Sequence, residues 1–191
     1  MASKLQQLIQ ELCPDGVEYK TLGDILTIRN GRDYKHLPKG NYPVYGSGGI
    51  IAKVGEYAYD QPSVLIPRKG SINNLFYVDV PFWTVDTIFY TEINDSYAVP
   101  KYIYYVLQRE HLEDLNTAGG VPSLTQSVLN KVSIPVPPLP VQAEIVRILD
   151  AFTELTAELT TALTAELTAR KKQYEYYRDW LLTFRARNAA E

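Results

Sequence analysis

Basic, amide and hydroxyl side chains gather on two short, turn-rich stretches, and this combination of groups suits contacts to nucleic acid. The stretches are "RNGRDYKHLPKG" and "PRKGSINN". Phosphate binding needs cations and hydroxyl or backbone donors. Base reading needs groups that can form two hydrogen bonds to one base edge, such as the planar guanidinium of Arg and the amide of Asn. The candidate residues are Arg29, Arg32, Lys35, Lys39, Arg68, Lys69, Ser71, Asn73 and Asn74. The alternative for any single residue is that Asn and Gly shape the turn and that Lys gives solubility.

The distribution of charge supports the same hypothesis. The chain of 191 residues has a formal net charge of −3. Residues 29–69 hold seven basic and three acidic side chains, a net charge of +4, and the remainder holds twelve basic and nineteen acidic side chains, a net charge of −7. A basic segment on an acidic chain is typical of a local polyanion-binding surface, although a solvated loop region with random charge fits the composition equally well.

The sequence lacks the patterns that indicate catalysis, a metal or a cofactor. Cys13 is the only cysteine, which excludes an internal disulfide and a cysteine-cluster metal site. His36 and His111 are isolated, and the acidic residues form no paired-carboxylate motif. The glycine-rich "GSGG" at 46–49 lacks the residues that complete a phosphate loop or a dinucleotide fingerprint. We therefore expect no catalytic site, no metal and no cofactor.

Hydropathy argues against a membrane or secreted protein. The longest uncharged apolar run is too short for a spanning helix, and the N-terminus has no signal-peptide pattern. We expect a cytoplasmic protein without a membrane partner.

The candidate residues lie in a region whose sequence pattern is typical of an α+β domain. Residues 3–12 place apolar side chains on one helical face, and "CPDG" then ends that helix. From about 21 to 134, short β-rich runs alternate with Gly, Pro, Asn and Asp clusters, with a helix predicted from Pro100. We predict a mostly antiparallel sheet or partial barrel with packed short helices in a domain of residues 1–140, which a proline-rich exit closes.

The remainder, residues 141–191, contains neither proline nor glycine and predicts one helix of about 45 residues. Its apolar residues step by three or four and form a single stripe. A helix this long cannot bury such a stripe on a small domain, so it needs another long helix as partner. The other predicted helices are shorter, which leaves a second copy or another protein.

Five segments together resemble the specificity subunit of type I restriction-modification systems. They are "LIQELCPDGVEYKTLGDI", "YPVYGSGGIIAKV", "PSVLIPRKGSINNLFYVDVPFWTVDTIFY", "GGVPSLTQSVLNKVSIPVPPLPVQAEIVRILDAF" and "LTAELTARKKQYEYYRDWLLTF". The resemblance implies a target recognition domain that reads double-stranded DNA and a helical conserved region that spaces the recognition domains. It also implies docking of methylation subunits and, through them, of restriction subunits. The usual subunit holds two recognition domains and two conserved helices, whereas this chain has one of each and resembles a half-length form.

The half-length form leads us to expect a homodimer. One recognition domain reads one half-site, and a two-fold dimer with antiparallel helices would place two such domains at opposite ends. The resemblance adds DNA contacts in the "GSGG" loop, on the following strand and in the loop "TAGGVPSLTQ", at Ser47, Lys53, Thr117, Ser123 and Gln126. The residues assigned to dimerisation are Leu155, Leu159, Leu163, Leu167, Tyr174, Tyr177 and Leu181. The aromatic end, from Tyr174 to Phe184, fits the dimer partner and a methylation subunit equally well.

A four-residue unit, Leu-Thr-Ala-Glu, repeats within residues 154–170 with one irregularity. Each unit lengthens a helix by about 6 Å, near two base pairs at about 3.4 Å each. We interpret the repeat as a spacer whose length sets the separation of two half-sites. The competing hypothesis is a coiled-coil dimeric adaptor whose β-rich domain binds protein or a small ligand, and an enzyme in its own right lacks any supporting motif.

Overall fold

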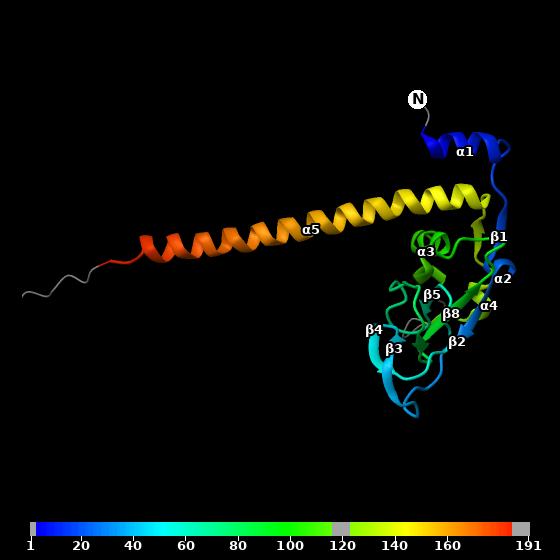
Figure 1. The fold of residues 1–191 in the computed structure, drawn as a ribbon, viewed down its shortest axis with the longest axis horizontal. Helices are drawn as coiled ribbons and strands as arrows, with labels where there is room; N and C mark the ends of the chain where they lie inside the picture. The colour runs from blue at the N-terminus through cyan, green and yellow to red at the C-terminus, as the bar shows by residue number, and fades with distance from the viewer. Residues whose placement is uncertain (1–2, 116–122, 185–191) are drawn as a thin grey trace, which may run out of the picture. The chain divides into compact units, whose positions relative to one another are not determined.

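The computed structural model describes residues 3–115 and 123–184. These residues belong to two compact units, Met1–Val146 and Arg147–Glu191 (Figure 1). The first unit combines three small sheets with short helices, and the second consists of the greater part of one long helix. The predicted α+β class with a long C-terminal helix is confirmed. No helix in the described part of the chain has the length and apolar character needed to cross a membrane.

A four-stranded antiparallel sheet forms the centre of the first unit. Its strands, in spatial order, are β2 (Leu26–Asn30), β8 (Ile88–Ile93), β5 (Ser63–Pro67) and β6 (Phe76–Val78). Every residue of β5 is buried, because one face meets the main core and the other meets a cluster around Phe82. Such two-sided burial explains why "SVLIP" shows a continuous apolar run instead of alternation.

A second sheet holds the glycine-rich hairpin. Strand β3 (Lys39–Gly46) pairs antiparallel with β4 (Gly49–Val54) and parallel with the short β7 (Trp83–Thr84). Gly49 has a φ of 115°, a conformation that residues with a Cβ rarely adopt. The "GSGG" stretch is therefore the tip of a hairpin, and the sheets are antiparallel as predicted except for the β3–β7 pair.

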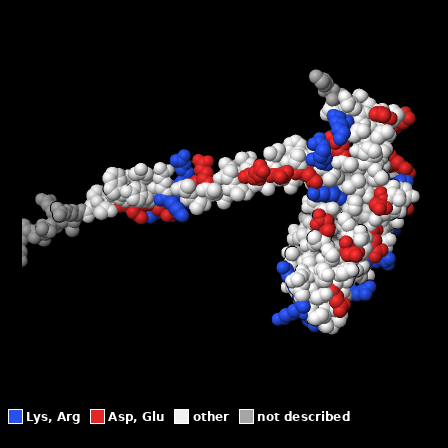
Figure 2. Space-filling view, viewed as in Figure 1, with Lys and Arg blue, Asp and Glu red and all other residues white. Residues whose placement is uncertain are grey.

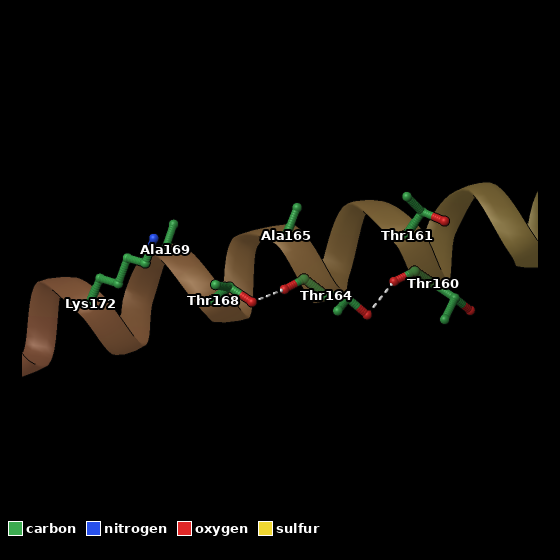
Figure 3. Close-up of a pocket in the computed structure, with 7 residues that line it drawn as sticks. All are labelled: Thr160, Thr161, Thr164, Ala165, Thr168, Ala169 and Lys172. Atoms are coloured by element: carbon green, nitrogen blue, oxygen red, sulfur yellow. Dashed lines mark hydrogen bonds between the residues drawn. The ribbon is translucent and has the colours of Figure 1, made fainter.

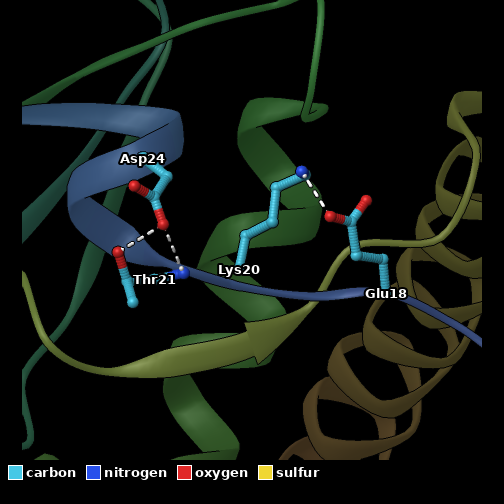
Figure 4. Close-up of polar contacts among 4 residues, drawn as sticks. All are labelled: Glu18, Lys20, Thr21 and Asp24. Carbon is cyan, nitrogen blue, oxygen red and sulfur yellow. Dashed lines mark hydrogen bonds and ion pairs between the residues drawn. The ribbon is translucent and has the colours of Figure 1, made fainter.

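A two-stranded sheet joins the two ends of the first unit. Strand β1 (Tyr19–Thr21) pairs antiparallel with β9 (Ser133–Pro135). The chain then enters α2 (Leu22–Ile25), where the Asp24 carboxylate accepts hydrogen bonds from the backbone N–H and the hydroxyl of Thr21 at 3.1 and 2.6 Å (Figure 4). These bonds lower the pKa of Asp24, and the nearby Glu18 raises the pKa of Lys20 through an ion pair of 2.7 Å.

The remaining helices of the first unit cover this framework. Helix α3 (Pro100–Arg109) packs on β5 and β6 with one apolar side buried (Figure 1). The short elements η1 (Leu112–Leu115) and α4 (Gln126–Leu129) follow, and Thr125 caps α4 through its hydroxyl. Near the N-terminus, α1 (Lys4–Leu12) begins with a capping box between Ser3 and Gln6.

Helix α5 runs from Leu139 to Leu181 and has 43 residues. It starts two residues before the predicted start at residue 141. It also includes Pro140, which was predicted to lie in a non-helical, proline-rich segment before the helix. Proline is compatible with a first helical turn because the N–H groups there have no intrahelical partner. The described helix ends at Leu181, short of the predicted 191, and residues 185–191 lie outside the described part.

The first turns of α5 are fixed to the β-rich framework by a buried amide. Gln142 is fully buried, and its Oε1 accepts from the Val99 N–H at 2.8 Å. Its Nε2 donates to the Tyr97 carbonyl at 2.9 Å and to the Pro137 carbonyl at 2.7 Å. One side chain thus joins the start of α3, the proline-rich exit and α5.

The segment that carries Arg29 and Arg32 is fixed by a close backbone approach. A Cβ on Gly31 would overlap the Val85 carbonyl and lie 2.6 Å from the Thr84 carbonyl oxygen. The Arg32 N–H donates to that Thr84 oxygen at 2.8 Å, and the Trp83 indole N–H donates to the Arg32 carbonyl at 3.0 Å. Glycine is required at position 31 because only hydrogen fits between these two chain segments.

We predict that Gln142→Ala lowers the free energy of unfolding by about 3 kcal/mol, because buried partners lose their hydrogen bonds. Urea denaturation of the variant and the unmodified chain measures this difference. Gln173→Ala on the exposed part of the same helix is the matched control and should change the free energy little. Equal effects of the two substitutions would contradict the role of the buried amide.

We predict that Gly31→Ala destabilises the first unit by about 1–3 kcal/mol through overpacking. Gly48→Ala is the control, since a Cβ there meets nothing within 4 Å. Thermal and urea unfolding of both variants provide the comparison. A Gly31→Ala chain as stable as Gly48→Ala would show that the two segments can separate without cost.

Candidate nucleic-acid interface

Three loops of the first unit meet at one edge of the sheets. The Ser47 N–H at the hairpin tip lies 3.4 Å from the Thr87 hydroxyl, and the Arg68 N–H donates to the Thr87 carbonyl at 3.0 Å. Lys69 forms an isolated antiparallel bridge with Ser123, beside a bond of 2.9 Å from the Leu124 N–H to the Arg68 carbonyl. We call Ser47, Arg68, Lys69, Thr87 and Ser123 the turn cluster; it joins segments that are far apart in the sequence.

Arg68 is the best-oriented basic side chain of the turn cluster. Its guanidinium carbon lies 5.3 Å from the centre of the Phe89 ring, within the range of a cation–π contact. Its Nε is buried and has no hydrogen-bond partner among the described residues. The ring restricts the position of the guanidinium without accepting a hydrogen bond from it. The N–H groups of the planar guanidinium therefore remain for an acceptor such as a base edge or a phosphate.

The loop after Arg68 exposes polar groups on a buried anchor. Ile72 is only 3% exposed and packs into the main core, while Ser71, Asn73 and Asn74 are exposed. Bonds from the Ile72 N–H to the Gly70 carbonyl and from the Asn74 N–H to the Ser71 carbonyl tighten the loop. A pinned loop with exposed hydroxyl and amide groups beside basic residues suits contacts to DNA.

The two arginines of the first basic stretch differ in their surroundings. Arg29 forms an ion pair with Glu92 on the neighbouring β8 at 2.9 Å, and this hydrogen bond raises the pKa of the guanidinium. Its charge is thereby compensated within the protein. Arg32 is exposed and follows the rigid Gly31 contact, so its side chain extends from a fixed backbone.

Three predicted lysines lie apart from the turn cluster. Lys39 begins β3 and Ser47 follows its last residue, so about 25 Å of extended strand separates them at about 3.3 Å per residue. Lys53 pairs with Pro43 toward the Lys39 end of the hairpin, and Lys35 lies in the loop before it. All three are exposed, and basic atoms are visible at the lower end of the first unit, where Figure 1 draws β3 and β4 (Figure 2). These three lysines are therefore not part of the turn cluster.

The residues predicted in the loop before α4 differ in their surroundings. The Gln126 amide donates to the Ile28 carbonyl at 3.0 Å and so holds α4 against β2. Ser123 belongs to the turn cluster through its bridge with Lys69. Thr117 lies outside the described residues.

Sequence reasoning missed residues whose role depends on pairing across the sheet. Thr87 organises the turn cluster, Phe89 supports Arg68, and Glu92 neutralises Arg29. All three belong to "DTIFYTEI", a sequence that predicts only a strand. The strand was visible in the sequence, but the partners of Phe89 and Glu92 required the register between β2, β5 and β8.

The second unit presents an apolar row along its helix. Leu155, Leu159, Leu163 and Leu167 are 55–60% exposed, and the more distal Tyr174, Tyr177 and Leu181 are exposed as well. The threonines bond back to the helix; for example, the hydroxyls of Thr164 and Thr168 donate to the carbonyls four residues earlier at 2.7 and 2.9 Å (Figure 3). Their hydroxyls are therefore satisfied within the helix, and this side of the helix carries mainly threonine and alanine between Thr160 and Lys172.

The described residues contain no group of three or more His, Cys, Asp or Glu side chains suited to a metal ion.

Comparisons with known proteins find relatives over most of the chain. A putative type I specificity subunit of Mycoplasma pneumoniae is 29% identical over 94% of this chain and 62% of its own length. A putative type I restriction enzyme specificity subunit of Haemophilus influenzae is 35% identical over 87% of this chain and 46% of its own length. The chain thus spans about half the length of the curated relatives it matches.

Solved structures share the fold. An S subunit of a type I restriction-modification system from M. genitalium superposes with a TM-score of 0.64 at 19% identity, covering 88% of this chain and 46% of that one. The HsdS subunit from Thermoanaerobacter tengcongensis gives a TM-score of 0.61 at 20% identity, covering 83% and 44%. Residues 14–169 match the family described as Type I restriction modification DNA specificity domain, and this match covers most of the sequence, so the chain belongs to that family.

Proposed function

We propose that this chain is a non-catalytic specificity subunit of a type I restriction-modification complex that reads one DNA half-site per copy. The observation that carries the proposal is the turn cluster, which places Arg68 and Lys69 beside hydroxyl groups on a rigid sheet edge in a chain of this family. The proposed recognition domain comprises residues 1–140, and residues 141–191 form the proposed spacer and dimerisation helix.

The chemistry of the turn cluster supports base reading as well as phosphate binding. A guanidinium held by an aromatic ring can donate two parallel hydrogen bonds to O6 and N7 of guanine in the major groove. The neighbouring Lys69, Ser71 and Asn73 provide the donors that phosphates and base edges accept. Lys35, Lys39 and Lys53 then act as a separate group that contacts backbone phosphates farther along the duplex.

A single recognition domain reads too little sequence for a useful target, so we propose a homodimer. Two copies with antiparallel α5 helices read two inverted half-sites around an unread spacer. The exposed leucine row and the residues Tyr174, Tyr177 and Leu181 supply the dimer contacts. The dimer docks methylation subunits, and through them the restriction subunits, in the cytoplasm where the DNA lies.

We predict that Arg68→Gln with Lys69→Gln weakens binding to the selected target by about tenfold to a hundredfold, because a bidentate base contact and a phosphate contact are lost. The slope of log affinity against log salt should fall by about one for the phosphate contact. Fluorescence anisotropy with the target and with random duplex, in the presence of methylation subunit, measures both quantities.

The matched control is Lys131→Gln, an exposed lysine on the turn between α4 and β9 that lies outside the turn cluster. It should leave target binding unchanged. If a randomised-duplex selection finds no preferred sequence, or if binding does not depend on salt, the proposal fails and the adaptor hypothesis is favoured.

We predict that deleting one repeat unit, residues 163–166, shortens the preferred spacer by about two base pairs, since the helix loses about 6 Å. The half-sites should stay the same, because the first unit is untouched. Selection from duplexes with randomised half-sites and variable spacers tests both statements. A changed half-site with an unchanged spacer would contradict the role of the repeat.

A further inference from the structure

We propose that the α5 helices of two copies pair antiparallel in one defined register, with the two-fold axis level with Thr161. The inference rests on the proposed homodimer and adds which residues face each other across it. In this register, residues that lie equally far before and after Thr161 are opposite each other in the two copies.

The leucine row is symmetric about this position. Leu159 of one copy lies opposite Leu163 of the other, and Leu155 lies opposite Leu167, so all four leucines of the row are covered by leucine. A shift by one repeat unit would place Leu155 opposite Lys171 or Leu167 opposite Ala151. Either shift exposes leucines that the symmetric register buries.

The layers beyond the leucine row also match. Phe152, which is 64% exposed, lies opposite Arg170, a pair suited to a cation–π contact. Tyr174, which is 67% exposed, lies opposite Ile148. The same register brings Tyr177 and Leu181 level with Ile145 and Val141 of the other copy, both of which pack into that copy's first unit. The aromatic end therefore contacts the first unit of the other copy instead of its leucine row.

The charges of the helix favour the antiparallel direction. Residues 150–158 contain three acidic side chains, Asp150, Glu154 and Glu158, and no basic one. Residues 164–172 contain three basic side chains and one acidic side chain, Glu166. Reflection about Thr161 lays these two segments opposite each other, so a net charge of −3 faces one of +2. A parallel pair would instead place like charges side by side in both segments, which is unfavourable.

The irregularity of the repeat falls at the axis. Regular units end in Glu, as at Glu158 and Glu166, but the unit between them is Leu-Thr-Thr-Ala and ends in Ala162. A two-fold axis brings a residue near it against its own copy, so a carboxylate at position 162 would repel itself. On an ideal helix of about 100° per residue, Ala162 flanks the leucine row, where this self-contact occurs.

Cross-linking between single-cysteine helices tests the register. Leu159→Cys and Leu163→Cys chains, one carrying a size tag, are mixed, allowed to exchange, and treated with a short thiol-to-thiol cross-linker. The unmodified chain is the blank, because its only cysteine, Cys13, is 7% exposed. We expect roughly tenfold more cross-linked dimer from this mixture than from either variant alone. The same excess is expected over the mixture of Leu155→Cys with Leu163→Cys, because the shifted register that would join those two positions loses a leucine layer.

Each other outcome overturns the inference. Strong self-cross-linking of both Leu159→Cys and Leu163→Cys would show parallel pairing. A stronger Leu155→Cys with Leu163→Cys product, or self-cross-linking of only one of the two variants, would show a shifted register while the homodimer stands. A chain that stays monomeric by light scattering at all concentrations would remove the proposed homodimer as well, which separates the two failures.

Restoring the regular unit provides a second test without cysteines. Ala162→Glu should weaken the dimer several-fold in sedimentation equilibrium, because the new carboxylates meet at the axis. Ala165→Glu is the matched control, as it adds the same charge on the side of the helix away from the leucine row, and it should leave the dissociation constant unchanged. Equal dissociation constants for the two variants would place the axis elsewhere.

Discussion

The buried amide of Gln142 is the contact on which the organisation of the chain depends. Its three hydrogen bonds to Tyr97, Val99 and Pro137 bring together the loop before α3, the proline-rich exit and the first turns of α5. A nearby buried carboxylate, Glu144, adds an ion pair of 2.9 Å to Lys4 of α1. A polar group buried this deeply is stable only when all its partners are present, so these contacts form together or not at all.

The electrostatics of the first unit show how an acidic chain can present a basic surface. Glu92 compensates Arg29, whereas Arg68 lies against the Phe89 ring and has no acidic partner among residues 3–115 and 123–184. Placement by an aromatic face keeps the guanidinium available to an anion in a way that an ion pair does not. The overall charge of −3 therefore says little about the edge where the loops converge.

Local sequence patterns predicted most elements but not the contacts between them. The runs "SVLIP", "IIAKV" and "TIFYTEI" became strands, and the stretch without proline or glycine became α5, because periodicity and turn residues act locally. The candidate site depended on long-range pairing. The Gln126 amide bonds to the Ile28 carbonyl, and the lysines at 35, 39 and 53 lie toward the far end of a hairpin from Ser47; neither arrangement follows from local sequence. Pro140 is another case that local sequence did not predict, because proline interrupts a helix interior but is compatible with the first turn, where it lies in α5.

The repeat in α5 has a rotational consequence as well as a translational one. Each four-residue unit turns the helix by about 400°, a net rotation of about 40°, whereas two base pairs turn B-DNA by about 70°. In the proposed dimer, adding a unit would therefore keep the two recognition domains nearly in step with the rise of the duplex but would leave them about 30° out of phase with its groove. A change of one unit is small enough for the protein and DNA to absorb by twisting. Successive additions would accumulate torsion, so the number of units that the proposed spacer tolerates would be limited by twist before it is limited by length.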